Sequence, residues 1–421
     1  MKKPVIVCVD DEQMILNSLN TQLRNKFGKQ FVYEFAEGGE EAIELIDELV
    51  EDGYEMVMLI SDQIMPGMTG DQLLVNVHKK YPKPIKVLLT GQASLNSAIN
   101  AINNANLYRY LNKPWDREDF LLTVEKGVQQ YNLLNSLEKQ VNTFSKFVPK
   151  QFLEHLSVEN YEDICDSEAK QINLSVLFAD IREFTALSET MTPKEVFVLL
   201  NKYFCCMDEQ IEQHHGFIDK FMGDGIMALF SRSATDSLKA AIGMQQQLLN
   251  CQSDISRSVK IGIGINTGEL LLGTIGSDKR IDSTVIGDAV NVASRMENLT
   301  KYYKTDIIIS ESCYQAIDSP EEFEIRELDF VRVYGKEQPI NIYEIINNKP
   351  AIYKQILPIF EEALNFYRQK EWDKAINCLD KCLKICPDDN VSHLYMARCH
   401  EFKITPPPSI WDGSFNVDKC E

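Results

Sequence analysis

The sequence lacks long apolar runs and an excess of basic residues, and each absence disfavours a class of protein. The longest apolar stretches, such as residues 56–60, are far shorter than the roughly 20 residues that a membrane-spanning helix needs. Lys and Arg number 43 against 63 Asp and Glu, and the formal net charge of −20 disfavours binding to nucleic-acid backbones and anionic membrane surfaces. Acidic residues interrupt the apolar segment near the N-terminus. We therefore expect no signal peptide and a cytoplasmic location, with no nucleic acid and no membrane among the partners.

An ordered cysteine framework is also absent. The 11 cysteines are odd in number and scattered, which is typical of reduced thiols in a cytoplasmic protein. Cys378, Cys382 and Cys386 recur every four residues and would share one helix face. A metal site is one interpretation, but small core residues beneath a helix hairpin are the favoured one.

The chain otherwise has the composition of a folded protein, and its 421 residues suggest two or three domains. The first 115 or so residues alternate short β-rich runs with amphipathic segments of helical length. This alternation predicts an α/β domain with a parallel sheet covered on both faces. The five predicted strands are residues 4–10, 31–36, 56–61, 85–90 and 107–111.

Polar residues follow four of these strands. Asp10 and Asp11 follow the first strand, Asp62 the third, Thr90 the fourth and Lys113 the fifth. Because the carboxyl ends of parallel strands meet at one edge of the sheet, these residues predict a single polar site there.

The motifs CVDDE, ISDQIMPGM, LLTGQAS and YLNKPW resemble the receiver domain of two-component response regulators, over about residues 4–125. The resemblance implies a flavodoxin-like, doubly wound domain, here bounded at residues 1–125, and a cognate sensor histidine kinase as partner. Three clustered carboxylates repel one another and need a hard cation such as Mg²⁺. The alternative is a receiver kept only for dimerisation. The implied roles are phosphoacceptor for Asp62, Mg²⁺ ligands for Asp10, Asp11 and Asp62, and switch residues for Thr90, Tyr110 and Lys113.

Residues 116–148 predict one long helix, because they contain no Pro and only one Gly. The apolar positions step by three and four, which predicts a coiled-coil seam and a parallel dimer, in a linker at residues 126–168. A helix packed on its own domain is the alternative, and Pro149 should end the helix. The seam positions are Phe120, Val124, Gly127, Tyr131, Leu134, Leu137, Val141, Phe144 and Val148.

A second folded region, residues 169–346, mixes strands and helices with hairpin-like joins. The order predicts an α+β, ferredoxin-like antiparallel sheet with helices on one face. Asp180 ends a predicted strand and Asp224 lies in the turn MGDG between two strands. Two such carboxylates could hold two divalent metals about 3.5–4 Å apart. The turn alone would also fit a diguanylate cyclase.

The downstream sequence decides between these interpretations. Asn291 and Arg295 are four residues apart on one predicted helix, so they can reach the same ligand. Their segment, together with FADIREFTALSE, FIDKFMGDGIMALF and GIGINTGELLLGTIG, resembles the class III nucleotide cyclases over nearly all of residues 172–346. The resemblance implies two Mg²⁺ or Mn²⁺ ions held by Asp180, Asp224 and the carbonyl of Ile181.

The same resemblance assigns four substrate residues. Lys220 and Thr284 match the base-selecting pair, Asn291 the ribose-orienting residue and Arg295 the transition-state arginine. In this family the metal aspartates come from one chain and the other four residues from its partner, which implies a homodimer with two sites. A lysine donor suits the adenine N1 and a threonine can accept from the 6-amino group, so ATP is favoured over GTP.

The expected function is therefore a phosphorylation-regulated adenylate cyclase, converting ATP to 3′,5′-cyclic AMP and pyrophosphate. A guanylate cyclase and a non-catalytic signalling scaffold remain the alternatives. Three departures from the family pattern bear on affinity and rate. They are Glu183 and His215, at positions where members commonly have Gly, and Tyr334, where some members keep a lysine that Lys336 could replace.

Residues 351–402 have the apolar spacing of a tetratricopeptide-like helical hairpin. One repeat is too few to stand alone, so we expect it to pack on the preceding domain or to serve as a docking hairpin. Residues 403–421 are expected to be an irregular, Pro-rich tail.

Overall fold

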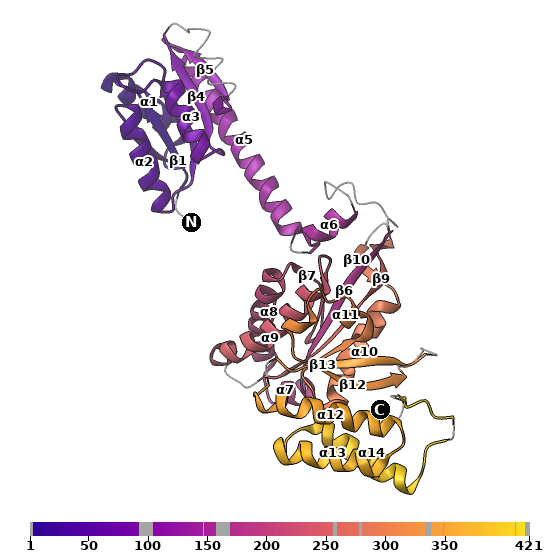
Figure 1. Cartoon of the computed structure of the whole chain (residues 1–421). Helices are drawn as coiled ribbons and strands as arrows, with labels where there is room; N and C mark the ends of the chain where they lie inside the picture. The colour runs from indigo at the N-terminus through magenta and orange to yellow at the C-terminus, as the bar shows by residue number, and fades with distance from the viewer. Residues whose placement is uncertain are drawn as a thin grey trace. The chain divides into compact units, whose positions relative to one another are not determined.

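A computed structural model describes residues 3–91, 104–145, 147–156, 169–255, 259–277, 280–332, 338–347, 349–408 and 410–416. The chain divides into two compact units, Met1–Lys146 and Phe147–Glu421 (Figure 1). The division falls near the end of the long helix predicted at residues 116–148.

The N-terminal unit is built on a parallel sheet in the order β2-β1-β3-β4-β5. Helices α1 and α5 cover one face, and α2 and α3 cover the other. The three central strands β1, β3 and β4 are buried throughout because both faces are covered, which confirms the predicted doubly wound domain. The elements are β1 Val5–Val9, α1 Gln13–Phe27, β2 Val32–Ala36, α2 Gly39–Glu51, β3 Met56–Asp62, α3 Gly70–Lys80, β4 Ile85–Thr90, β5 Arg109–Asn112 and α5 Arg117–Phe144.

Helix α5 has two different halves. Phe120, Val124 and Tyr131 are buried in the core of the N-terminal unit, and the Tyr131 hydroxyl donates a 2.9 Å hydrogen bond to Glu55. At Gly127 the helix lies so close to the sheet that an added Cβ would be 2.5 Å from the Met58 side chain. The prediction of an intermolecular seam starting at Phe120 is therefore wrong for this half, which covers its own sheet.

The second half of α5 leaves its apolar positions exposed. Leu134, Leu137, Val141 and Phe144 are all exposed, as predicted for a helix that leaves its domain. Their pairing with a second copy stays a prediction. The helix ends at Phe144, and Pro149 immediately precedes α6, Lys150–Leu156.

The C-terminal unit contains a nine-stranded sheet in the order β14-β12-β13-β11-β9-β6-β8-β7, with β10 paired to β9. The four strands β9-β6-β8-β7 are antiparallel throughout and form the predicted ferredoxin-like core. Strand β11 then joins β9 in parallel and extends the sheet. The strands are β6 Ala169–Ile181, β7 Gly216–Met222, β8 Gly225–Phe230, β9 Ile261–Ser277, β10 Arg280–Ile286, β11 Ile307–Ser310, β12 Ile325–Arg332, β13 Ile340–Ile345 and β14 Phe415–Asn416.

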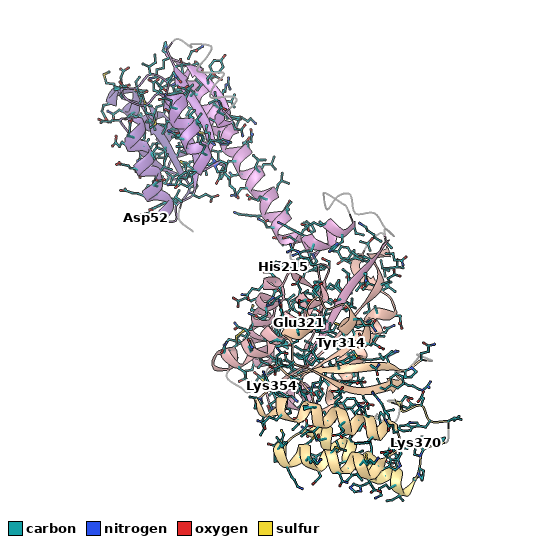
Figure 2. The ribbon with its side chains drawn as sticks, viewed as in Figure 1. Asp52, His215, Tyr314, Glu321, Lys354 and Lys370 are labelled. Carbon is teal, nitrogen blue, oxygen red and sulfur yellow. A yellow bond between two sulfur atoms is a disulfide. The ribbon has the colours of Figure 1, made fainter. Side chains whose placement is uncertain are left out.

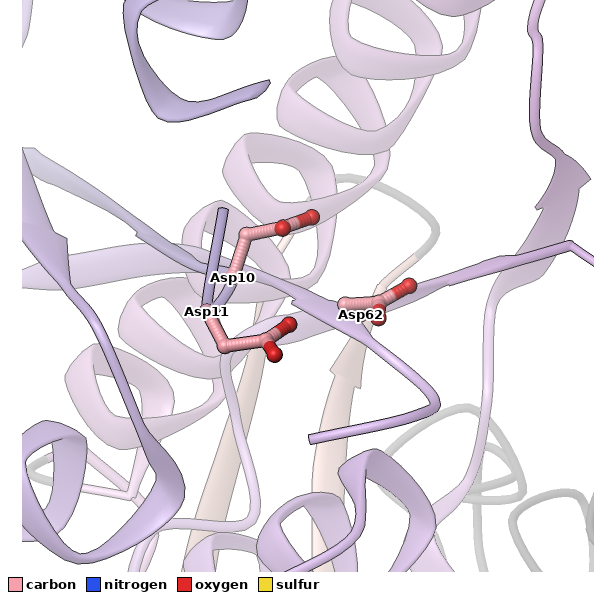
Figure 3. Close-up of side chains that lie close together, drawn as sticks. All are labelled: Asp10, Asp11 and Asp62. Carbon is pink, nitrogen blue, oxygen red and sulfur yellow. The ribbon is translucent and has the colours of Figure 1, made fainter. Parts of the chain in front are cut away.

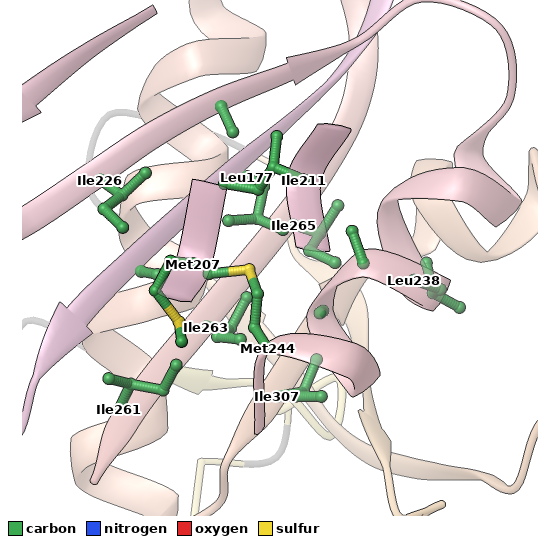
Figure 4. Close-up of a cluster of buried hydrophobic side chains, with 14 of the residues drawn as sticks. Leu177, Met207, Ile211, Ile226, Leu238, Met244, Ile261, Ile263, Ile265 and Ile307 are labelled. Atoms are coloured by element: carbon green, nitrogen blue, oxygen red, sulfur yellow. The ribbon is translucent and has the colours of Figure 1, made fainter. Parts of the chain in front are cut away.

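Helices cover both faces of this sheet, so the prediction of helices on one face is wrong. Along β6, Leu177 and Ala179 pack against α8 and α9, in the core drawn in Figure 4. Val176 and Phe178 pack on the opposite face, with Phe152 of α6 and residues of α10. The Val176–Ala179 part of strand β6 is apolar on both sides, so it needs both covers. The helices are α7 Phe184–Glu189, α8 Pro193–Gln213, α9 Ala234–Ile255, α10 Asp288–Tyr303 and α11 Glu311–Gln315.

Three helices follow the sheet: α12 Ile352–Arg368, α13 Trp372–Ile385 and α14 Asn390–Ile404. They share a core with α10, so the segment packs on the preceding domain, as one of the two expectations had it. The three cysteines spaced by four residues are buried in this core, as the favoured interpretation predicted. The predicted irregular tail also contains β14, which pairs with β12.

Helices α8 and α9 lie side by side and are joined by a disulfide between Cys206 and Cys251. The expectation that the cysteines are all reduced is wrong for this pair, because helix packing rather than sequence spacing brings the two together. Within the described ranges, no helix is both long enough and apolar enough to span a membrane.

Candidate functional site

Three carboxylates meet at the carboxyl edge of the N-terminal sheet. The side chains of Asp10, Asp11 and Asp62 each place an oxygen within 4.8 Å of the others (Figure 3). Asp10 and Asp62 are buried, whereas Asp11 is exposed. The ammonium of Lys113 lies 2.7 Å from both Asp10 Oδ2 and Asp62 Oδ1. The structure thus brings together four of the residues that the sequence assigned to this site.

The charges in this cluster are only partly balanced. Burial raises the pKa of Asp10, although the neighbouring Lys113 opposes that rise. Burial lowers the pKa of Lys113, but hydrogen bonds and charges from the two aspartates outweigh it and leave the pKa raised. One lysine among three carboxylates leaves an excess of negative charge and of oxygen donors, which fits a hard divalent cation.

The two predicted switch residues lie on neighbouring strands. Thr90 ends β4, and its buried hydroxyl has no hydrogen-bond partner among the described residues. Tyr110 lies on β5 with its side chain exposed. The Lys113–Pro114 peptide bond is cis, as the resemblance implied.

In the C-terminal unit, Asp180 and Asp224 come together from separate elements. Asp180 is the penultimate residue of β6, and Asp224 lies in the turn between β7 and β8. Gly223 makes this turn with a φ of 67°, a conformation that glycine adopts without a steric penalty. Burial, together with a hydrogen bond and repulsion from Asp180, raises the pKa of Asp224 to about 6. Two carboxyl groups within hydrogen-bonding reach of each other fit a site for divalent cations.

The predicted base-selecting pair also meets. Lys220 Nζ on β7 donates a 2.7 Å hydrogen bond to Thr284 Oγ1 on β10, across 64 residues of sequence. Asn291 and Arg295 lie on α10, and neither makes an ion pair or side-chain hydrogen bond with another described residue. All four side chains are at least partly accessible.

Comparisons with known proteins identify both regions. A family model described as the response regulator receiver domain matches residues 6–125, and one described as the adenylate and guanylate cyclase catalytic domain matches residues 167–347. The chain combines a receiver domain with a nucleotide cyclase domain. The expected domain bounds, 1–125 and 169–346, stay predictions.

Two curated relatives match half or more of this chain. An adenylate cyclase of Anabaena cylindrica is 44% identical over 221 residues, which are 50% of this chain and 44% of the relative. An adenylate cyclase, terminal-differentiation specific, of Dictyostelium discoideum is 35% identical over 278 residues, 63% of this chain and 13% of the relative. This chain therefore spans less than half the length of these relatives. The solved adenylyl cyclase CyaB from P. aeruginosa is 30% identical, covering 43% of this chain and 96% of that chain with a TM-score of 0.39.

The cyclase domain contains two charged residues that sequence reasoning missed. Lys301 Nζ on α10 donates a 2.9 Å hydrogen bond to Asp180 Oδ2. The same ammonium lies 3.5 Å from Glu297 Oε1, which is also 3.8 Å from Arg182 Nη1. Glu297 and Lys301 lie on the same helix as Arg295, and they are spaced i, i+4 from each other. That spacing is a detectable signal for a pair, but it does not reveal Asp180 as the partner.

Two of the departures from the family pattern lie where glycine is structurally favoured. Glu183 precedes α7 with a φ of 55°. His215, which is labelled in Figure 2, joins α8 to β7 with a φ of 61°. A side chain in the left-handed region carries a steric cost that glycine avoids. Members with Gly at these positions would avoid that cost. Tyr334 and Lys336 lie outside the described residues.

Proposed function

We propose that this chain is an adenylate cyclase that converts ATP to 3′,5′-cyclic AMP and pyrophosphate, under control of its receiver domain. The observation that carries the proposal is the pairing of Asp180 with Asp224 in a domain whose Lys220 and Thr284 also meet. The names of the curated relatives support the adenylate product.

Asp180 and Asp224, with the carbonyl of Ile181, would hold two Mg²⁺ or Mn²⁺ ions. The donor set fits, because closely spaced, partly buried carboxylates are poorly balanced without a cation. When bound, the ions would supply Lewis-acid activation of the ATP 3′-hydroxyl and neutralise charge on the leaving pyrophosphate. The Ile181 amide hydrogen-bonds Asp224 and so helps to hold it in place.

Base choice rests on Lys220 and Thr284. The hydrogen bond between them aligns the ammonium beside a hydroxyl that can still accept a hydrogen bond. This pairing offers a donor to the adenine N1 and an acceptor to the 6-amino group. Guanine carries an N1–H and an O6 instead, so its N1–H would face the Lys220 ammonium and two donors would oppose each other.

We infer that two copies of the chain share each site. Arg295 precedes Lys301 by six residues, about 9 Å along α10 and about 240° around it, so the two side chains point to different sides. Lys301 faces the Asp180 of its own chain, which leaves Asn291 and Arg295 for ATP on the metals of the partner subunit. Exposed apolar side chains on the edge strand β7 and on the β9–β10 arm would be covered in such a dimer. They are Phe221, Met222, Leu271, Ile275 and Ile286.

The receiver would act through the second half of α5. A cognate sensor histidine kinase would provide phosphoryl groups to Asp62, with Mg²⁺ held by Asp10, Asp11 and Asp62. Phosphorylation would give the Thr90 hydroxyl a partner and reposition Tyr110. The exposed Leu134, Leu137, Val141 and Phe144 would then form the parallel coiled coil that transmits the change.

One assay separates this proposal from a guanylate cyclase and from a scaffold. Purified protein is incubated with ATP or GTP and with Mg²⁺ or Mn²⁺, and the cyclic nucleotide is quantified. We expect cyclic AMP from ATP and little product from GTP, and nearly complete loss of product in Asp224→Asn. Product from GTP alone would establish a guanylate cyclase. Absence of both products would favour the scaffold.

A further inference from the structure

Strand β7 contains a bulge next to the base-selecting lysine. Ile218 pairs with Ala228 of β8 and Lys220 pairs with Met227, so Asp219 is an extra residue without an opposite partner. Such a bulge disturbs the alternation of side chains and can turn two consecutive residues toward the same face. Met227 faces the side of the sheet covered by α6 and α10, and Lys220 opposite it shares that face.

The Asp219 carboxylate is deeply buried and poorly satisfied. Its side chain is 1% exposed, and neither oxygen has a hydrogen-bond partner in the part of the chain that the structure describes. Burial raises the pKa of Asp219 to about 6, although the charge of Lys220 opposes the rise. A buried carboxylate without hydrogen bonds is costly, so a strand built only for stability would have an apolar residue here.

Asp219 forms an ion pair with the neighbouring Lys220. The ammonium of Lys220 lies 3.5 Å from Asp219 Oδ2 on one side and donates to Thr284 Oγ1 at 2.7 Å on the other. The lysine side chain is 31% exposed, so it can reach a ligand that Asp219 cannot. A flexible lysine loses conformational freedom when held in one geometry, and a fixed opposite charge favours that geometry.

We propose that Asp219 is the positioning residue for base recognition, which holds the ammonium of Lys220 beside Thr284 so that it faces the purine ring. This inference rests on the proposed adenylate cyclase function. Asp219 acts through Lys220 and does not touch the nucleotide. Asp180, Asp224 and Arg295 are left in place when Asp219 is changed, so the effect falls on nucleotide binding and selection rather than on the chemical step.

The test compares full-length wild-type protein with Asp219→Asn. We measure kcat and KM for ATP and GTP, and equilibrium binding of 3′-deoxy-ATP and 3′-deoxy-GTP, which lack the reacting hydroxyl. We expect 3′-deoxy-ATP to bind about five- to tenfold more weakly, 3′-deoxy-GTP binding to change little, and kcat for ATP to stay within about twofold. Asp282→Asn on β10 is the matched control. It makes the same change at an exposed aspartate near Asp219 and should behave as wild type.

A second experiment tests whether Asp219 affects nucleotide binding through Lys220. In a Lys220→Met background, adding Asp219→Asn should leave the affinity for both analogues unchanged, because the residue on which Asp219 acts is gone. If Asp219→Asn does not fold, Asp219→Ala replaces it in both backgrounds.

Two results would overturn the inference. One is wild-type affinity and ATP preference in a folded Asp219 variant, and the other is an equal loss for both analogues accompanied by a lower melting temperature. Failure of the proposed function would appear elsewhere, as wild-type protein that makes no cyclic AMP or does not prefer 3′-deoxy-ATP.

Discussion

Lys301 of α10 donates a hydrogen bond to Asp180 of β6, with 2.9 Å between Nζ and Oδ2. The ammonium therefore forms an ion pair with Asp180, which we infer to be a metal ligand, and it also lies 3.5 Å from Glu297 Oε1. A divalent cation arriving at Asp180 would have to displace this charge or bind beside it. Because Lys301 is 47% exposed, solvent screens the interaction and its strength should be modest.

Replacing Lys301 should therefore tighten metal binding. We expect Lys301→Met to bind Mn²⁺ about three- to fivefold more tightly than wild type in the absence of nucleotide, since one competing charge is removed. Electron paramagnetic resonance of free Mn²⁺ measures this directly. Lys304→Met, at an exposed position three residues later, is the control. Weaker Mn²⁺ binding in Lys301→Met would show that Lys301 supports the metal site rather than competing with it.

Mixing two inactive variants tests whether sites are shared between chains. Asp180→Asn and Arg295→Ala proteins should each be inactive alone, because each lacks one residue at both sites of its homodimer. At equal mixing we expect about a quarter of the wild-type activity, since half of the dimers are heterodimers and each has one intact site. Native mass spectrometry confirms that heterodimers are present. Absence of recovery with heterodimers present would place all six residues of a site in one chain.

If Lys220 and Thr284 select the base, replacing both should change which nucleotide the protein prefers. Lys220→Glu combined with Thr284→Cys replaces the donor facing the purine N1 with an acceptor, and we expect the preference to shift from ATP toward GTP. Total activity should fall, because new polar pairs seldom match the original geometry. The ratio of cyclic GMP to cyclic AMP formed from equal nucleotide concentrations is the measurement. An active double variant with the wild-type ratio would show that neither residue contacts the base.

Acid should weaken the attachment of the C-terminal helices. The guanidinium of Arg326 on β12 pairs with Glu344 on β13 and with Asp389 at the start of α14, and all three are buried. Burial opposes ionisation of Asp389, but Arg326 and Ser392 outweigh it and hold the pKa of Asp389 below its ordinary value of 3.8. Because the pKa of Asp389 is lower in the folded state than in the unfolded state, Asp389 contributes fully to stability above its unfolded-state pKa. This contribution is lost as the pH falls through its folded-state pKa.

We therefore expect the free energy of unfolding of the C-terminal unit to decrease in wild type as the pH drops below about 4. At neutral pH, Asp389→Asn should lose about 3–5 kcal/mol, since it leaves Arg326 with a single counter-charge. Urea unfolding followed at several pH values gives both quantities. The neighbouring Asp388→Asn is exposed and should match wild type. A pH dependence unchanged by Asp389→Asn would assign the acid sensitivity to other carboxyl groups.

Local patterns were enough to predict the five strands of the N-terminal sheet, the mixture of strands and hairpins in residues 169–346 and the aspartate pair. They did not predict β14, which lies in the segment expected to be an irregular tail. They were not enough where one pattern fits two environments. The three- and four-residue steps in α5 are the same for Phe120, which covers its own sheet, and for Leu137, which is exposed. Contacts across long separations were also missed. Lys301 reaches Asp180 over 121 residues, and Arg326 reaches Asp389 over 63, with no local signal for either.

The last prediction concerns control of the cyclase by the receiver. Lys113 contacts both Asp10 and Asp62, and Thr90 at the end of the neighbouring strand has a hydroxyl without a hydrogen-bond partner among the residues that the structure describes. A phosphoryl group on Asp62 would therefore meet a cation and a hydroxyl donor. Helix α5 packs on this same sheet with its first half and exposes apolar positions with its second. A change in the receiver can therefore alter how two α5 helices pair, and small misplacements of catalytic residues strongly reduce rate.

We expect BeF₃⁻ with Mg²⁺ to raise cyclase activity, and Asp62→Asn to abolish that response while keeping basal activity. Activity is measured with and without BeF₃⁻ over a wide range of protein concentration. If the receiver only promotes dimerisation, the stimulation should disappear at concentrations where the protein is already dimeric. Stimulation that persists there indicates a change within the dimer, as a coiled-coil rearrangement requires. Activity that never responds to BeF₃⁻, with binding to the receiver demonstrated, would mean that the receiver does not regulate this cyclase.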